Sequence, residues 1–382
     1  MAETARKVAL VLGTSAGGVG RHVRMLAEGL AREGHQVVVA GPASTDAAFG
    51  FSGVARFAEV PISDRPRPMS DARAVGRLRS LVAGADVVHA HGLRAGALAA
   101  LALAGRRTGL VVTLHNALTA GGVTGAIYGV LERIVARNAD QVLVVAPDLG
   151  ERMTARGARS VAPAVVPAPP LAPSGRTPAE VRAELAAEAQ GRPERAAWAV
   201  PGLGEGARPI FLTIARLAQQ KGLETLLEAA RGPFGDRTAT PLFVIAGEGP
   251  LRGELQARID AEGLPVVLLG DRADVADLLQ AADAVLVPSR WEGQPLNVQE
   301  ALRAGRAIVA TAVGGIPAMV GDAALLVPPG DAVALRSAIA GLLGDPELAA
   351  RLSAAAAARP LPGEQDALRS VRAAYEAVRH GR

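Results

Sequence analysis

The stretch LGTSAGGVGRHV, residues 12–23, follows an apolar run and contains four glycines, a pattern typical of a turn between a strand and a helix. A Walker-type phosphate loop would need Gly-Lys-Ser/Thr, but Val19 and Gly20 follow Gly18. A dinucleotide fingerprint would need a third glycine where Val23 stands and an acidic end to the next strand, QVVVAGP, which has none. Two interpretations remain: a glycine turn that lets a ligand approach the backbone, and a plain strand-to-helix turn.

Apolar, β-branched runs like the one before this turn recur along the chain and alternate with helical patterns, which predicts two doubly wound α/β domains. The first series comprises residues 7–13, 36–42, 86–92, 110–115 and 141–146. The second comprises residues 209–215, 241–247, 265–270, 283–289 and 307–312. The proline-rich residues 161–178 predict a linker, because proline interrupts both ladders and helices. We expect a cleft between the domains, with ligands at the carboxyl ends of the strands.

Composition narrows the class of protein. The 382 residues are 49% hydrophobic and 20% charged, enough to bury the cores of two domains. There is no run of 18 apolar residues and no convincing signal peptide, so we expect a cytoplasmic location. The absence of cysteine excludes disulfides, thiolate metal sites and cysteine nucleophiles.

Charge is distributed unevenly. Residues 1–170 carry 19 Lys+Arg and 12 Asp+Glu, a net charge of +7, and residues 171–382 carry 22 and 25, a net charge of −3. A basic half suggests an anionic partner such as a membrane surface, but an arginine-rich solvated face is the favoured explanation. Only 3% of residues are aromatic, which argues against a nucleic-acid partner.

Arg216 and Lys221 follow a predicted strand and open a predicted helix. Two cations at a helix N-terminus suit a diphosphate, because the helix dipole adds to their charge. The chain has 41 Lys+Arg but only two lysines, Lys7 and Lys221, so a lysine in this loop is notable. A solvated helix start is the alternative interpretation.

SRWEGQPLNVQEALRAG, residues 289–305, places two carboxylates eight residues apart, Glu292 in a loop and Glu300 in the second turn of the next helix. Pro295 suits the first helical position and Gly305 the position after the last. Carboxylates accept hydrogen bonds from sugar hydroxyls. They also complement a helix dipole, and this stretch alone leaves both interpretations open.

Histidines end two strands of the first series. His115 follows the strand VVTL at the carboxyl edge of the predicted sheet, where it could donate or accept a hydrogen bond at neutral pH. His89 and His91 alternate along a strand and therefore share a face. Without Asp, Glu or Cys ligands nearby, we do not predict a metal site for them.

Five motifs follow one another in the second half: RLAQQKG, IAGEGP (245–250), the Glu292/Glu300 pair, TAVGGIP (311–317) and LLVPPGD (325–331). With GGVGRHV and TLHN in the first half, the chain resembles the retaining glycosyltransferases of family 4. The resemblance covers nearly the whole chain and implies the α/β GT-B fold, with two Rossmann-like doubly wound domains facing a central cleft. It implies an acceptor domain over residues 1–168, joined by a helix over 364–380, and a nucleotide-sugar donor domain over 169–363.

The resemblance implies roles for individual residues. It assigns Arg216 and Lys221 to the donor diphosphate, Glu300 to the nucleotide ribose and Glu292 to the hydroxyls of the donor sugar. It places His115 beside the reacting sugar, and Gly17 and Gly18 in the loop that meets the phosphate or the acceptor. The implied donor site further contains Gly247, Gly293, Gln294, Pro295 and Leu296. Gln294-Pro295-Leu296-Asn297 departs from the usual Phe-Gly-Leu-Pro after Gly293, which leaves the donor's identity open.

The implied reaction moves a sugar, typically a hexose, from a nucleoside diphosphate sugar to an acceptor hydroxyl with retention of anomeric configuration. No D-x-D occurs, and two cations can do the work of magnesium, so we expect no metal and no cofactor beyond the co-substrate. The acceptor, a small molecule, glycan or lipid, is not identified, and a lipid acceptor would place the protein on the inner membrane face. Alternatives are a sugar-nucleotide epimerase, a glycogen-synthase-like enzyme and a non-catalytic nucleotide-sugar binding module.

Overall fold

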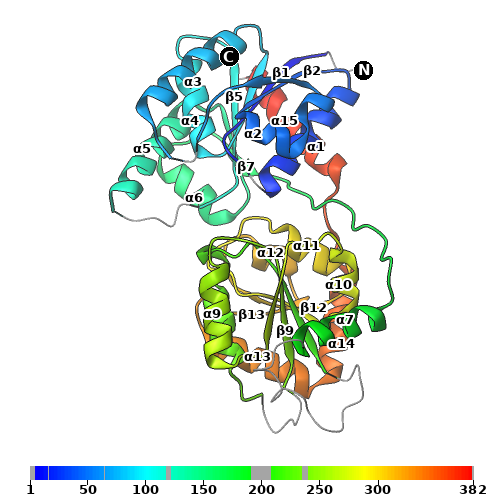
Figure 1. The fold of residues 1–382 in the computed structure, drawn as a ribbon. Helices are drawn as coiled ribbons and strands as arrows, with labels where there is room; N and C mark the ends of the chain where they lie inside the picture. Colours follow the sequence, from blue (N-terminus) through cyan, green and yellow to red (C-terminus); the bar gives the residue numbers. More distant parts are fainter. Residues whose placement is uncertain are drawn as a thin grey trace. The chain divides into compact units, whose positions relative to one another are not determined.

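The computed structural model describes residues 5–15, 17–63, 65–117, 122–190, 208–234 and 240–380 (Figure 1). The chain divides into two compact units. Unit 1 comprises residues 1–167 and 362–382, and unit 2 comprises residues 168–361. The chain therefore passes from one unit to the other twice, once after Pro167 and again after Leu361.

Unit 1 is built on a seven-stranded parallel sheet in the order β3-β2-β1-β4-β5-β6-β7. The strands are β1 (Lys7–Leu12), β2 (Gln36–Gly41), β3 (Arg56–Glu59), β4 (Val87–His91), β5 (Gly109–Leu114), β6 (Gln141–Val144) and β7 (Val161–Pro163). The central strands β4 and β5 are buried along their whole length. A strand that is buried on both faces needs apolar side chains at successive positions, which is why the sequence pattern located these strands.

The helices of unit 1 are α1 (Gly18–Arg32), α2 (Ala43–Phe49), α3 (Pro68–Leu81), α4 (Leu93–Ala102), α5 (Gly122–Asn138), α6 (Pro147–Ala155) and α15 (Glu364–His380), with one 3-10 turn, η1 (Phe51–Gly53). The last helix, α15, returns from the end of the chain and packs against α1 and β5 (Figure 1). A Cβ at Gly29 would lie 2.6 Å from Leu368, and a Cβ at Gly109 would lie 2.1 Å from Val378. Small residues on α1 and β5 therefore allow this close packing.

Unit 2 has a six-stranded parallel sheet in the order β10-β9-β8-β11-β12-β13. Its strands are β8 (Ile210–Ile214), β9 (Leu242–Ala246), β10 (Val266–Gly270), β11 (Ala284–Val287), β12 (Ala307–Thr311) and β13 (Ala324–Val327). Its helices are α7 (Pro178–Gln190), η3 (Gln219–Lys221), α8 (Leu223–Ala230), α9 (Arg252–Glu262), α10 (Val275–Ala281), α11 (Leu296–Arg303), α12 (Ile316–Val320), α13 (Ala332–Gly344) and α14 (Pro346–Ala358). Successive residues of β9 enter two different apolar clusters, one on each face of the sheet.

The two sheets follow the same winding rule. In each, the first strand of the unit lies between its second and its fourth, so the strand order reverses beside β1 in unit 1 and beside β8 in unit 2. The predicted fold, two Rossmann-like doubly wound α/β domains, is confirmed. Open sheets of this kind bind ligands where the order reverses. These switch points lie between β1 and β4 and between β8 and β11.

Two details of the sequence interpretation are wrong. The predicted linker over 161–178 begins with strand β7, and α7 starts at its last residue, Pro178. A proline at the end of an edge strand breaks no ladder bond on which the sheet depends, so Pro163 is tolerated there. The strands β3 and β13 were not predicted, because β3 is largely exposed and β13 is only partly buried.

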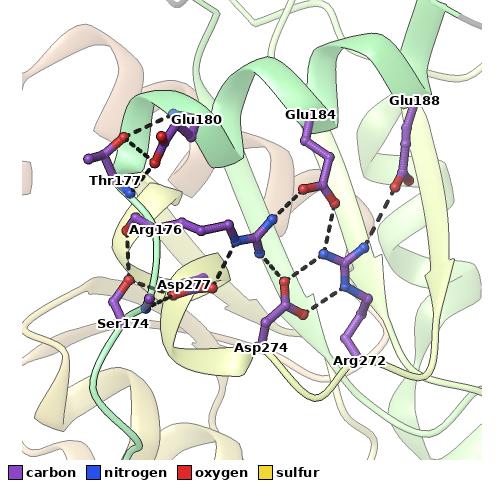
Figure 2. Close-up of polar contacts among 10 residues, drawn as sticks. Ser174, Arg176, Thr177, Glu180, Glu184, Glu188, Arg272, Asp274 and Asp277 are labelled. Carbon is purple, nitrogen blue, oxygen red and sulfur yellow. Dashed lines mark hydrogen bonds and ion pairs between the residues drawn. The ribbon is translucent and has the colours of Figure 1, made fainter.

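A network of ion pairs fixes the segment that enters unit 2 (Figure 2). Arg176 pairs with Glu184 and Asp274, and its Nε lies 2.9 Å from Asp277. Arg272 pairs with the same Glu184 at 2.9 Å and the same Asp274 at 2.6 Å. Because the two arginines share carboxylates, the network ties the chain before α7 and the chain before α10 together.

Candidate active site

Lys221 and Glu292 form an ion pair at the switch point of unit 2. Lys221 ends η3 after β8, and Glu292 lies in the loop after the neighbouring strand β11. The Nζ of Lys221 lies 2.6 Å from Oε1 of Glu292, and Ser289 Oγ donates to the same oxygen at 2.7 Å. Glu292 is buried, whereas the side chain of Lys221 is 22% exposed. The ammonium is thus held by a carboxylate at the end of a side chain that is partly exposed.

Two glycines bring the loops of this site together. Gly222 has a φ of +61°, and a Cβ there would lie 2.0 Å from the carbonyl oxygen of Pro288. Gly314 has a φ of +52°, and its Cβ would lie 1.8 Å from the carbonyl oxygen of Glu292. Only glycine tolerates both the left-handed conformation and the close approach. The loops after β8, β11 and β12 therefore pack backbone against backbone and hold Glu292 in place.

Arg216 differs from Lys221 in its surroundings. It lies two residues beyond β8 and is exposed. Within the described part of the chain, nothing forms a hydrogen bond or an ion pair with its guanidinium. Gly247, with a φ of +143°, would bring a Cβ within 2.0 Å of the carbonyl oxygen of Ala215, so the loop after β9 lies directly against this loop. The predicted pair of cations comprises one paired lysine and one solvated arginine.

The other predicted donor residues lie in residues 293–300. The prediction that Pro295 is the first helical residue is wrong: α11 begins at Leu296, and Pro295 caps it with an extended ψ of 125°. Gly305 has a φ of +61° just after the helix, as predicted. The amide of Asn297 donates to the carbonyl of Ile214 at 2.8 Å, which ties the start of α11 to the end of β8. Gly293 is buried, and Gln294 and Glu300 are half-buried in this region.

Unit 1 gathers four of the six histidines of the chain at its own switch point. His22 lies in α1, His91 ends β4 and His115 follows β5. The Nδ1 of His91 lies 3.1 Å from Nε2 of His115. The ring of His22 meets both edge-on, with centroids 5.7 Å from His91 and 5.6 Å from His115. The sequence interpretation singled out His115 but missed its contact with His91.

The fourth histidine, His89, packs against His91 and is held by two hydrogen bonds. Its Nδ1 lies 3.0 Å from the hydroxyl of Tyr375 in α15, and its Nε2 lies 2.7 Å from Oγ1 of Thr113. Its ring centroid lies 4.2 Å from that of His91. Thr113 and Tyr375 are buried, so the cluster is fixed by side chains from two strands and two helices.

Burial keeps these histidines neutral. Desolvation lowers the pKa of His115 to about 4. Desolvation and the nearby His115 lower the pKa of His89 to about 3. Desolvation and the neighbouring imidazoles also lower the pKa of His22 and of His91 well below its ordinary value. A neutral imidazole has one donor and one acceptor nitrogen. Among the described residues, no group of three or more His, Cys, Asp or Glu could hold a metal ion.

The glycines of residues 12–23 have different uses. A Cβ at Gly20 would lie 2.1 Å from the ring of Phe49, so this glycine lets α1 pack against α2. Gly17, just before α1, is exposed, and a Cβ there would meet nothing within 4 Å. Gly18 is the first residue of α1. At this helix N-terminus the backbone N–H of Gly20 already donates to Oγ of Ser15 at 3.1 Å.

Sequence reasoning missed Ser289, Gly222 and Gly314 on unit 2 and His22 on unit 1. Gly222 directly follows Lys221, and Gly314 lies within the motif TAVGGIP, so a glycine in each of these motifs was an available signal. Nothing in the local pattern distinguishes His22 from an ordinary helical residue.

Comparisons with known proteins agree with this arrangement. Residues 17–169 match the family model "Glycosyl transferase 4-like domain", and residues 208–345 match "Glycosyl transferases group 1". A phosphatidyl-myo-inositol mannosyltransferase of Mycobacterium leprae is 30% identical over 360 residues, which covers 89% of this chain and 87% of that protein. The chain belongs to the family 4 glycosyltransferases.

Other members of the family match a smaller part. The alpha-D-kanosaminyltransferase of Streptomyces kanamyceticus is 34% identical over 167 residues, 42% of each chain. The chain therefore matches about two fifths of the length of that relative. Among solved structures, the sucrose-phosphate synthase of Thermosynechococcus elongatus has a TM-score of 0.75 at 22% identity and covers 99% of this chain and 100% of that one. Anabaena HepE, solved in complex with UDP, has a TM-score of 0.75 at 18% identity, with 97% and 100% covered. These two structures share the fold.

Proposed function

We propose that the chain transfers a sugar from a nucleoside diphosphate sugar to an acceptor hydroxyl with retention of the anomeric configuration. The observation that carries the proposal is the Lys221–Glu292 pair at the switch point of unit 2, with the exposed Arg216 in the same loop as Lys221. The pair places a cation that can bind phosphate next to a carboxylate that can accept hydrogen bonds from sugar hydroxyls.

In the proposed reaction, the bond between the anomeric carbon and the diphosphate breaks, and the acceptor oxygen forms a bond to that carbon on the same face. The acceptor proton passes to the departing phosphate. Negative charge grows on the diphosphate as the bond breaks, so Arg216 and Lys221 stabilise the transition state more than the ground state. The carboxylate of Glu292 accepts hydrogen bonds from the donor sugar.

The remaining roles in the proposal are those that the resemblance to family 4 implies. Glu300 binds the hydroxyls of the nucleotide ribose, and the loop from Gly293 to Leu296, with Gly247, surrounds the donor. Gly17 and Gly18 form the loop at the start of α1 that meets a phosphate or an acceptor. His115 contacts the reacting sugar as a neutral hydrogen-bonding group.

The proposal includes activity without a divalent metal, because Arg216 and Lys221 supply positive charge where other glycosyltransferases use a D-x-D motif that this chain lacks. Addition of EDTA should leave turnover unchanged. A requirement for Mg²⁺ or Mn²⁺ that no other ion replaces would contradict this part of the proposal.

Uridine nucleotides are the first donors to test, because Anabaena HepE was solved with UDP and with UDP-glucose. The acceptor is a small molecule, a glycan or a lipid. No described helix has the length and apolarity needed to cross a bilayer. Support for a lipid acceptor comes from α3, on which Met69, Arg73 and Arg77 are exposed at intervals of four residues.

The experiment that tests the function is a thermal-shift screen of nucleoside diphosphates, followed by incubation of the matching sugar nucleotides with candidate acceptors. Release of nucleoside diphosphate that depends on the acceptor, with an α-linked product from an α-linked donor, supports the proposal. Interconversion of the donor without an acceptor would identify an epimerase. Binding without turnover of any donor would identify a binding module.

A further inference from the structure

His91 ends β4, and His115 follows the neighbouring strand β5, so parallel pairing brings the two imidazoles together from 24 residues apart. The Nδ1 of His91 lies 3.1 Å from Nε2 of His115. His91 is 2% exposed and His115 is 9% exposed. The contact is therefore a buried hydrogen bond between two rings whose orientation the surrounding residues fix.

A hydrogen bond between two neutral imidazoles contains one proton. If His91 donates from Nδ1, then His115 accepts at Nε2 and carries its own proton on Nδ1. If His115 donates from Nε2, its Nδ1 is a bare acceptor and the proton of His91 lies on Nε2. The direction of the hydrogen bond to His91 thus decides whether Nδ1 of His115 is a donor or an acceptor.

The second ring nitrogen of His91, Nε2, determines which of these two states is preferred. This nitrogen is buried and has no hydrogen-bond partner among the described residues. A buried N–H without an acceptor loses a hydrogen bond that it made to water, and such orphaned donors are rarer than under-satisfied acceptors. The preferred state leaves that nitrogen bare and puts the proton of His91 on Nδ1. His115 then accepts at Nε2 and presents an N–H at Nδ1.

Packing holds both rings in this arrangement. His22 lies edge-on against the rings of His91 and His115, and His89 lies 4.2 Å from His91 at an interplanar angle of 32°. His89 in turn is fixed by Tyr375 and Thr113. His91 therefore cannot swing away and release His115 without disturbing a buried cluster.

We propose that His91 is a positioning residue that presents His115 to the substrate as a neutral Nδ1–H donor, an inference that rests on the proposed glycosyl transfer. The oxygen it would recognise is a hydroxyl or a phosphate oxygen of the reacting sugar nucleotide. In this role His115 donates a hydrogen bond and does not remove the acceptor proton, which agrees with transfer of that proton to the departing phosphate.

The test that does not depend on activity is nuclear magnetic resonance of protein labelled with ¹⁵N-histidine, in which long-range ¹H–¹⁵N correlations report which ring nitrogen carries the proton. Comparison with His115→Asn assigns the signals of His115. We expect a protonated Nδ1 and a bare Nε2 on His115 in the wild type. A wild-type His115 protonated on Nε2 would overturn the proposal.

Kinetics give the second readout. His91→Leu should lower kcat by about tenfold to a hundredfold while the KM for the donor changes little, because the lost interaction concerns the reacting sugar. His91→Asn keeps an amide near the position of Nδ1 and should recover most of the loss, whereas His91→Gln, whose amide lies near the position of Nε2, should not. Equal turnover of wild type and His91→Leu would overturn the proposal.

A matched control is His35→Asn, because His35 is also buried in unit 1 and uses its Nδ1 to accept from the backbone N–H of Arg6. Its kcat should equal that of the wild type. If the wild type turns over no sugar nucleotide, the proposed function fails, while the tautomer of His115 still decides whether His91 has this positioning role.

Discussion

The switch points of the two units have the same strand arrangement, but the side chains around them are neutral in unit 1 and charged in unit 2. In unit 1, between β1 and β4, buried and neutral imidazoles surround His115. In unit 2, between β8 and β11, Lys221 pairs with Glu292 and Arg216 lies exposed nearby. Each site stands where the strand order reverses, because that is where two adjacent loops diverge and leave room for a ligand.

The difference shows that the fold sets the position of a ligand site, whereas the side chains of the loops set which ligand groups it can bind. Fixed cations suit a diphosphate, whose charge grows as it leaves. Neutral imidazoles suit hydroxyls, to which they can donate without attracting an anion. Under the proposed function, we therefore expect charge stabilisation in unit 2 and neutral hydrogen bonding in unit 1, and four measurements test this division.

The largest effect is expected for Lys221→Ala. Loss of one preorganised cation should lower kcat/KM by about a hundredfold to a thousandfold and weaken nucleoside diphosphate binding. The matched control is Lys7→Ala, which removes the only other lysine of the chain, exposed at the start of β1. Arg216→Ala should act like Lys221→Ala, and the double variant should be less than additive. Wild-type turnover of Lys221→Ala would refute the diphosphate assignment.

The next effect concerns stability against pH. The pKa of His115 falls from its ordinary 6.5 to about 4 on folding, so between these values the unfolded chain binds more protons than the folded one. Stability should therefore be lost as pH falls through this window, by about 3 kcal/mol from this residue alone.

Denaturant unfolding at several values between pH 7 and pH 4 measures this loss, and His115→Asn should show a shallower dependence. The interval from pH 6.5 to pH 5 is the most informative, because most carboxylates are still ionised there. A free energy of unfolding that stays constant over that interval would show that the cluster is not buried in its neutral form.

A smaller effect separates the two units directly. His115→Ala should lower transfer by about tenfold to a hundredfold and leave nucleoside diphosphate affinity nearly intact. Glu300→Ala should instead weaken nucleotide affinity, because the ribose hydroxyls lose their acceptor. Calorimetric titration of both variants with the matching nucleoside diphosphate decides the matter. The reverse result, with binding lost only in His115→Ala, would reverse the division of labour.

The smallest effect is expected at the surface of unit 1. If its basic face meets anionic lipid, the protein should sediment with acidic vesicles at low salt and be released as salt rises. Arg73→Glu on α3 should weaken this binding by about fivefold to tenfold, since each basic residue near the surface contributes on the order of 1 kcal/mol. Arg351→Glu, on an exposed position of α14 in unit 2, is the control. Equal sedimentation with neutral and acidic vesicles would leave the arginines as a solvated face.

Much of the fold could be predicted from the sequence, because strands buried on both faces require unbroken apolar runs. Each of the ten predicted runs overlaps a strand of the structure, from β1 (Lys7–Leu12) to β12 (Ala307–Thr311). The edge strands β3, β7 and β13 escaped prediction, and none of them is buried along its whole length. Motif spacing likewise located Lys221, Glu292 and His115 within their loops.

Only the tertiary structure decided which of these side chains meet. Lys221 and Glu292 are 71 residues apart and touch because β8 and β11 are neighbours at the reversal of strand order, with Gly222 allowing the loops to close. His91 meets His115 through the pairing of β4 and β5, and both rings pack against His22 of α1, a helix distant in sequence. A linear pattern records local periodicity, whereas contact and desolvation depend on every segment packed around a site.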